Sequence, residues 1–242
     1  MRNIRIYQPG AYVPGDLVQL SPAAHQHVGV VLRMKPGDPL TLFAGNNQEF
    51  YGLISPTSTR KQTHVEIQTA KEVNRESPRI IHLGQAISKG ERMEIVIQKA
   101  VELGVSSITP IVSKHCAIKF DEERKVKKHV QWQNIAISAC EQSGRNSIPT
   151  IHPICSFSSY LQKTTAALRL TLNPYSKKSW RDCAFTGDIE LLIGPEGGLA
   201  EEEILQAEEY NFQSISLGPR ILRTETAAIA ILSVLQAMSG DL

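Results

Sequence analysis

A chain of 242 residues with 41% hydrophobic and 21% charged residues is typical of an ordinary globular protein with one or two domains. Its formal charge of +2 does not by itself require a nucleic-acid partner. No run of roughly 18 apolar residues occurs and the N-terminus has no apolar signal segment, so we expect a cytoplasmic protein without a membrane span.

The first 72 residues contain short apolar segments separated by Pro, Gly and Asn, a pattern typical of a small β-barrel or sandwich. A polar stretch at 71–78 ends in proline. We therefore predict one domain over residues 1–72 and a second over 73–242. The predicted strands of the first domain are 4–8, 27–34, 39–45, 48–55 and 63–70.

The rest of the chain alternates between apolar strands and segments with helical periodicity, which predicts an α/β domain with a mainly parallel sheet. The predicted strands are 79–87, 106–113, 166–174, 189–198 and 212–220, and the predicted helices are 89–105, 121–145, 199–210 and 224–238. Between Ala227 and Leu235 only Ser233 is polar. A helix that is apolar on nearly all sides is buried on nearly all sides, so we predict a homodimer that forms through this helix.

The four cysteines and seven histidines show no pattern of a metal or redox site. Cys116, Cys140, Cys155 and Cys183 are not in CxxC spacing, and the chain has no HExxH motif. We therefore expect free thiols and no metal ion.

Three predicted strands end in loops that mix small residues with proline, at 171–174, 193–198 and 217–226. In open α/β sheets, ligands bind beyond the carboxyl ends of the strands, and glycine lets the backbone approach them closely. Ordinary turn chemistry is the alternative reading of any single loop. Together the three loops favour a pocket of backbone donors and acceptors that suits a purine. No GxGxxG, GxxxxGK[ST] or GxSxG motif occurs.

The segments "LLIGPEGGLAEEEI" and "SLGPRILRTETAAIAIL" resemble the signature of SPOUT-class RNA methyltransferases, and more narrowly that of the RsmE family, which methylates N3 of a uridine in small-subunit (16S) ribosomal RNA. The resemblance covers almost the whole chain. Residues 4–8 and 25–45 resemble that family's PUA-like RNA-binding barrel, and residues 88–116 and 139–151 resemble its central motifs. The chain departs from the family at His115-Cys116, to which we assign no role, and at Ala200, where a Ser or Thr helix cap is usual.

The resemblance implies a trefoil-knotted SPOUT domain in which the three loops hold S-adenosylmethionine. The cofactor contacts it implies are Leu172, Pro174, Ile193, Gly194, Pro195, Glu196, Gly197, Gly198, Leu217, Gly218, Ile221 and Leu222.

Uracil N3 must lose a proton during methylation, so the site needs a base or a group that stabilises the anionic ring. Arg223 is our candidate for the stabilising cation, with a structural ion pair to Glu225 or Glu196 as the alternative. Glu225 is a candidate base, although a carboxylate at a helix start is also favourable by itself. Glu196 either braces Arg223 or faces a positively charged cofactor.

The substrate implied is ribosomal RNA or the small ribosomal subunit, and the target base must leave its stack to be reached. Gln142 and Arg145 are either RNA contacts or a polar end of the long helix. The candidates for phosphate contacts are Arg2, Arg5, Arg33, Lys114 and Lys119, each of which singly also fits a solvated surface charge. Methylation of a ribose 2′-hydroxyl or of another base, and a non-catalytic RNA-binding assembly factor, are the alternative functions.

Overall fold

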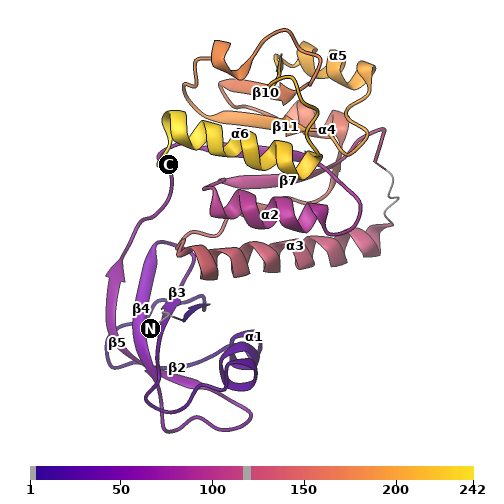
Figure 1. The fold of residues 1–242 in the computed structure, drawn as a ribbon. Helices are drawn as coiled ribbons and strands as arrows, with labels where there is room; N and C mark the ends of the chain where they lie inside the picture. Colours follow the sequence, from indigo (N-terminus) through magenta and orange to yellow (C-terminus); the bar gives the residue numbers. More distant parts are fainter. Residues whose placement is uncertain (1–3, 117–120) are drawn as a thin grey trace. The chain divides into compact units, whose positions relative to one another are not determined.

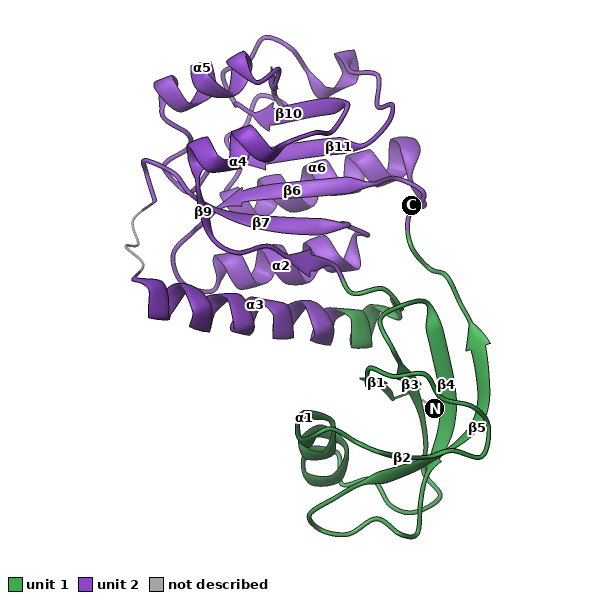
Figure 2. Cartoon of the chain, turned by 180° about the vertical axis from the view of Figure 1, so that it is seen from behind, with its two compact units in different colours: residues 1–76, 140–148 green, residues 77–139, 149–242 purple. Residues whose placement is uncertain are grey.

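The computed structural model describes residues 4–116 and 121–242 and divides into two compact units. Unit 1 comprises residues 1–76 and 140–148, and unit 2 comprises residues 77–139 and 149–242 (Figure 2). The division near residue 76 lies four residues from the boundary expected from the sequence. The segment 140–148, however, packs with unit 1 although it follows more than sixty residues of unit 2 along the chain.

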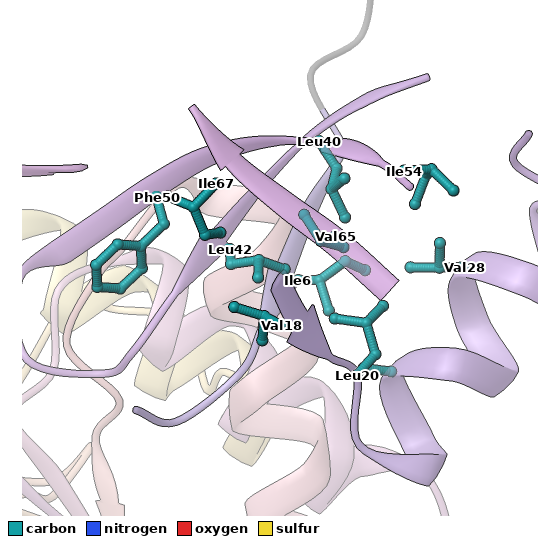
Figure 3. Packing of buried hydrophobic residues seen from close by; sticks show 11 residues of the cluster. Ile6, Val18, Leu20, Val28, Leu40, Leu42, Phe50, Ile54, Val65 and Ile67 are labelled. Atoms are coloured by element: carbon teal, nitrogen blue, oxygen red, sulfur yellow. The ribbon is translucent and has the colours of Figure 1, made fainter. Parts of the chain in front are cut away.

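Unit 1 is built on a curled five-stranded sheet with the strand order β1-β3-β4-β5-β2. The first two of these strands, β1 and β3, run parallel, and the other pairs are antiparallel. Apolar side chains from all five strands and from the helical segment fill one core, in which Val28, Leu40, Leu42 and Val65 are fully buried (Figure 3). The strands are β1 (Arg5–Tyr7), β2 (Leu17–Gln19), β3 (Pro39–Phe43), β4 (Gln48–Ile54) and β5 (His64–Glu72).

The strand predicted over 27–34 is wrong, because residues 27–31 are helical and residues 32–34 belong to no strand. Helix α1 (Pro22–His25) is followed directly by the π-helix η1 (Gln26–Val31). Ser21 caps the start by accepting a hydrogen bond from the amide of Ala24 at 3.3 Å, and proline occupies the first helical position. Only Val28 of the apolar run is buried. The local capping signal thus overrides the β propensity of the valines.

A buried carboxylate ties the segment 140–148 into unit 1. The Glu49 side chain is 4% exposed and accepts hydrogen bonds from Arg5 Nη1 at 2.6 Å, Arg75 Nη1 at 2.5 Å and Asn146 Nδ2 at 3.0 Å. Burial alone would raise the pKa of Glu49, but these hydrogen bonds outweigh burial and lower the pKa to about 2. Asn146 is fully buried and also donates to the carbonyl oxygen of Val73 at 2.7 Å.

Unit 2 contains the predicted parallel sheet, and every strand pair in it is parallel. Its order is β12-β10-β11-β6-β7-β8, and the short β9 also pairs with β7. The last strands, β10, β11 and β12, are neighbours, so their carboxyl ends meet at one edge. The strands are β6 (Ile81–Ala86), β7 (Ser107–Val112), β8 (Thr150–Ile151), β9 (Cys155–Ser156), β10 (Leu168–Leu172), β11 (Ile189–Ile193) and β12 (Gln213–Ile215).

Helices α2 and α6 lie side by side on one face of this sheet, and α4 covers the opposite face (Figures 1 and 2). The sequence did not reveal α4, the short strands β8 and β9, or η2. No helix in the described ranges is long and apolar enough to cross a membrane. The helices are α2 (Arg92–Glu102), α3 (Glu122–Ser143), α4 (Phe157–Lys163), the 3-10 helix η2 (Trp180–Asp182), α5 (Glu201–Glu209) and α6 (Thr224–Ser239).

Candidate functional site

A pocket of about 300 Å³ lies at the carboxyl ends of β10, β11 and β12. The loops that follow these three strands and the start of α6 form its walls. All twelve residues that the sequence indicated as cofactor contacts line this pocket. It is also lined by Asn173, Tyr175, Leu199, Ile204, Ile215, Arg220, Thr224 and Ala227.

Glycine is needed in these loops for two different reasons. At Gly194 an added Cβ would lie 2.8 Å from the backbone nitrogen of Leu199, so the loop packs too tightly for a side chain. Gly198 and Gly218 have φ values of +71° and +133°, which L side chains rarely adopt. An added Cβ at either position would meet no protein atom within 4 Å, so bare backbone borders open space there. Such walls fit a ligand recognised by backbone groups.

Arg92, near the start of α2, connects two carboxylates beside the pocket. Its Nη1 donates to Glu196 Oε1 at 2.5 Å, and its Nε lies 3.9 Å from Glu225 Oε2. The amide of Lys89 also donates to Glu196, at 2.9 Å. Burial would raise the pKa of Glu196, but the hydrogen bonds from backbone amides and Arg92 outweigh it and lower this pKa. Glu196 is therefore held as an anion by Arg92 and not by Arg223.

Arg223 and Glu225 stand at the start of α6. Arg223 precedes the first helical residue and is exposed, and within the described residues its side chain forms no ion pair with Glu225 or Glu196. The structural ion pair considered for Arg223 is therefore absent from this part of the chain. Glu225 is 15% exposed, and its Oε2 atom accepts no hydrogen bond from the described residues.

The two departures from the family pattern have local explanations. His115 Nδ1 donates to the carbonyl oxygen of Gly198 at 3.1 Å, so this side chain supports the glycine loop. Ala200 has no capping side chain, but Glu203 Oε2 accepts a hydrogen bond from its amide at 3.0 Å. The other oxygen of Glu203 accepts from the amide of Lys114 at 2.7 Å, which ties α5 to the end of β7. Glu203 thus makes the second bond of a capping box, to the amide of the N-cap residue, while the bond from a Ser or Thr cap is missing.

Two of the proposed RNA contacts need correction. The Arg5 side chain is 9% exposed and pairs with Glu49, and the Arg145 side chain is 7% exposed and pairs with Glu76. Buried and ion-paired guanidinium groups are not available to phosphate, so both arginines have a structural role in unit 1. The alternative of a polar end of the long helix stays a prediction for Arg145, which lies two residues beyond the end of α3 at Ser143.

The remaining RNA candidates stay predictions. Arg33 and Gln142 are exposed in unit 1. Lys114 is 59% exposed at its side chain and pairs with Glu202 in unit 2. Arg2 and Lys119 lie outside the described residues.

Sequence reasoning missed Gln85 and Arg92. Gln85 is a fully buried amide in β6, and the available signal was a polar residue inside the apolar run 79–87. Arg92 offered no signal, because a charged residue in the first turn of an amphipathic helix is common. No group of His, Cys, Asp and Glu residues in the described ranges could hold a metal ion.

The chain is similar to known RNA methyltransferases over most of its length. Residues 75–236 match the model of the RNA methyltransferase domain family. Ribosomal RNA small subunit methyltransferase E of Buchnera aphidicola (strain Sg) is 40% identical over 98% of this chain and 97% of its own length. The protein of the same name from Bacillus subtilis is 32% identical over 89% of each chain.

Two solved structures superpose over the whole chain. A Legionella pneumophila protein solved in complex with the cofactor SAM has a TM-score of 0.96 and 54% identity, with full coverage of both chains. Ribosomal RNA small subunit methyltransferase E from Neisseria gonorrhoeae, bound to S-adenosyl methionine, has a TM-score of 0.92 and 36% identity, again over 100% of both chains. The chain therefore belongs to the family of ribosomal RNA small subunit methyltransferases E, with the RNA methyltransferase domain over residues 75–236.

Proposed function

We propose that this protein transfers a methyl group from S-adenosylmethionine to N3 of a uridine in 16S ribosomal RNA. The observation that carries the proposal is the pocket, where three loops, two of them containing glycine, meet at the carboxyl ends of adjacent parallel strands. The family supports the reaction class, and the relatives solved with the cofactor support its identity.

The pocket suits S-adenosylmethionine chemically. Leu172, Ile193, Leu217 and Leu222 offer apolar walls, and the glycine loops offer backbone donors and acceptors, which together match an adenosine. The carboxylate of Glu196 adds negative charge at the wall, which favours a cationic ligand over a nucleotide phosphate. When bound, the cofactor supplies a methyl group already activated on a sulfonium, so the protein mainly has to align donor and acceptor.

Arg223 is the group that we assign to charge stabilisation. Uracil becomes negative as N3 loses its proton, and an exposed guanidinium that forms no ion pair with the described residues can meet that charge. Glu225 is the candidate base, and its Oε2 atom, which accepts no hydrogen bond from the described residues, is consistent with that role. Its Oε2 atom also lies 3.9 Å from Arg92 Nε, so Arg92 stands beside the proposed base.

Three further features belong to the proposal. Unit 1 acts as a PUA-like RNA-binding module, supported by its curled five-stranded sheet. The loops around the pocket form a trefoil knot, as the family resemblance implies. The protein is a homodimer through α6, supported by apolar side chains such as Ile229 and Val234 that remain only half-buried on this helix.

The test is methylation in vitro by the purified protein, with radiolabelled S-adenosylmethionine and two substrates, naked 16S RNA and intact small subunits from a strain that lacks the activity. Mass spectrometry of digested nucleosides identifies the product. We expect 3-methyluridine. A 2′-O-methylated nucleoside or another methylated base would overturn the site of transfer, and cofactor binding without turnover on either substrate would favour an assembly factor.

A further inference from the structure

A small polar cluster lies directly behind the pocket, where three distant segments meet. The Thr224 hydroxyl donates to the carbonyl oxygen of Gly194 at 2.7 Å. Gln85 Nε2 donates to Thr224 Oγ1 at 3.0 Å, to the carbonyl oxygen of Ala86 at 3.0 Å and towards that of Gly194 at 3.5 Å. Gln85 is 0% exposed and Thr224 is 5% exposed, so water does not compete for these bonds.

The chemistry allows only one orientation of the Gln85 amide. Two backbone carbonyls and a hydroxyl that already donates its proton all face Nε2, so only an NH₂ group can satisfy them. The Oε1 atom is then buried without a hydrogen-bond partner among the described residues. An unsatisfied buried acceptor destabilises a fold. An apolar side chain of similar size would avoid this cost, which points to a role for the amide beyond packing.

The partners of Gln85 explain what that role is. Gly194 opens the cofactor loop after β11, and Thr224 is the first residue of α6, between Arg223 and Glu225. Both line the pocket, whereas Gln85 does not. The side-chain amide of Gln85 thus connects two parts of the site, the loop proposed to bind the cofactor and the start of the helix proposed to perform the chemistry. It holds them at a defined distance from each other.

We infer that Gln85 and Thr224 are positioning residues, which couple the cofactor loop at Gly194 to the catalytic turn at Arg223–Glu225. This inference rests on the proposed function, because it assigns the residues that preorganise the same site. Preorganisation of a loop lowers the entropy lost on binding, and it keeps the reacting groups aligned. Loss of the cluster should therefore weaken cofactor binding and slow turnover without unfolding the protein.

The experiment is a double-mutant cycle with Gln85→Met and Thr224→Val, each close in volume to the native residue. The readouts are the Kd for S-adenosylmethionine by calorimetry, kcat and KM on small subunits, and the thermal midpoint. Each single variant should raise Kd about tenfold. The Kd of the double variant should also rise about tenfold and not about a hundredfold, because both changes break one cluster. Thr224→Ser, which keeps the hydroxyl, should restore near-native affinity.

The matched control is Gln236→Met. Gln236 is also a buried glutamine (1% exposed) whose Nε2 donates to a backbone carbonyl, that of Leu103 at 2.7 Å, but it does not line the pocket. This variant should lose thermal stability and keep the native Kd. Gln85→Met should keep its thermal midpoint, because it also removes an unsatisfied acceptor.

The outcomes separate the two claims. If the unmodified protein does not bind S-adenosylmethionine, the proposed function fails. If it binds and Gln85→Met binds equally well, or if the two single effects simply multiply, the positioning role is wrong. If Gln85→Met and Gln236→Met change only stability, Gln85 is merely structural and the inference is also wrong.

Discussion

Arg223 shows how much of the proposed chemistry depends on a single exposed side chain. We expect Arg223→Ala to reduce turnover by about a hundredfold or more, a usual loss when a group that stabilises developing charge is removed. The Kd for S-adenosylmethionine should stay nearly unchanged, since Arg223 is not among the residues that line the pocket. Initial rates and calorimetry measure the two effects separately. Arg124→Ala, an exposed arginine on α3 with an exposed ion-pair partner, is the charge-matched control. Unchanged turnover would refute the assigned role.

Glu49 makes a prediction about acid stability. Its pKa is about 2 in the folded protein against 4.5 for an ordinary glutamate, so it stabilises the fold above pH 4.5, and this contribution is lost as pH falls towards 2. The shift corresponds to a contribution on the order of 3 kcal/mol for this 4% exposed carboxylate.

Denaturant unfolding of the native protein and Glu49→Gln between pH 7 and pH 3 checks this. The difference in unfolding free energy should be largest near neutral pH and shrink towards pH 3. The control Glu72→Gln changes an exposed carboxylate of β5 and should show little difference at any pH. If the difference in unfolding free energy between the native protein and Glu49→Gln does not depend on pH, the stabilisation assigned to the ionised Glu49 is wrong.

Elements were predictable where a local pattern determines them. The strands β3, β4, β6, β7 and β10 to β12, and the helices α2, α3 and α5, lie within segments whose apolar periodicity and Gly or Pro boundaries indicated them, and β5 and α6 extend only two residues and one residue beyond theirs. The failures lie where two local signals compete or where the element is short. In the segment 27–34, valines favour a strand while Ser21 and Pro22 start a helix, and periodicity cannot weigh one against the other.

The segment 140–148 yields a prediction at this scale. Asn146→Ala removes donors to Glu49 and to the carbonyl oxygen of Val73, so we expect a loss of about 2–4 kcal/mol from unit 1. Hydrogen exchange should become faster in β3, β4 and β5, while cofactor affinity stays unchanged. Asn134→Ala, at an exposed position on α3, is the control. Faster exchange confined to unit 2 would show that this segment does not stabilise unit 1.

Helix α6 carries the prediction of a dimer. Light scattering of the native protein should give about twice the 26.8 kDa of one chain. Val234→Lys places a charge on the half-buried apolar side of α6, and a charge in a buried interface is costly, so this variant should be monomeric. The control is Ala237→Lys, which places a charge at an exposed position of α6. It tests whether a charge anywhere on this helix also makes the protein monomeric. A native protein of one chain's mass would exclude the dimer.

At the scale of the whole molecule, two units with separate cores predict separate responses to the cofactor. The pocket lies entirely in unit 2. S-adenosylmethionine at about 100 times its Kd should stabilise unit 2 by about 2.7 kcal/mol, which corresponds to a rise of roughly 5–10 °C in its thermal midpoint. Scanning calorimetry should show that the transition of unit 1 does not move. An equal shift of both transitions would mean that the units unfold as one.

The sequence by itself indicated the class of the larger unit and the three loops at which the pocket lies, because strand periodicity and strand ends with glycine or proline are local features, while the individual cofactor residues came from the resemblance to a family. Only the tertiary structure decided which groups pair. Gln85 meets Thr224 across 139 residues of sequence, Arg92 meets Glu196 across 104, and Glu49 meets Asn146 across 97. Any of several charged or amide side chains would suit each partner chemically. Their choice depends on where the folded backbone brings them, and a pattern of neighbouring residues does not contain that information.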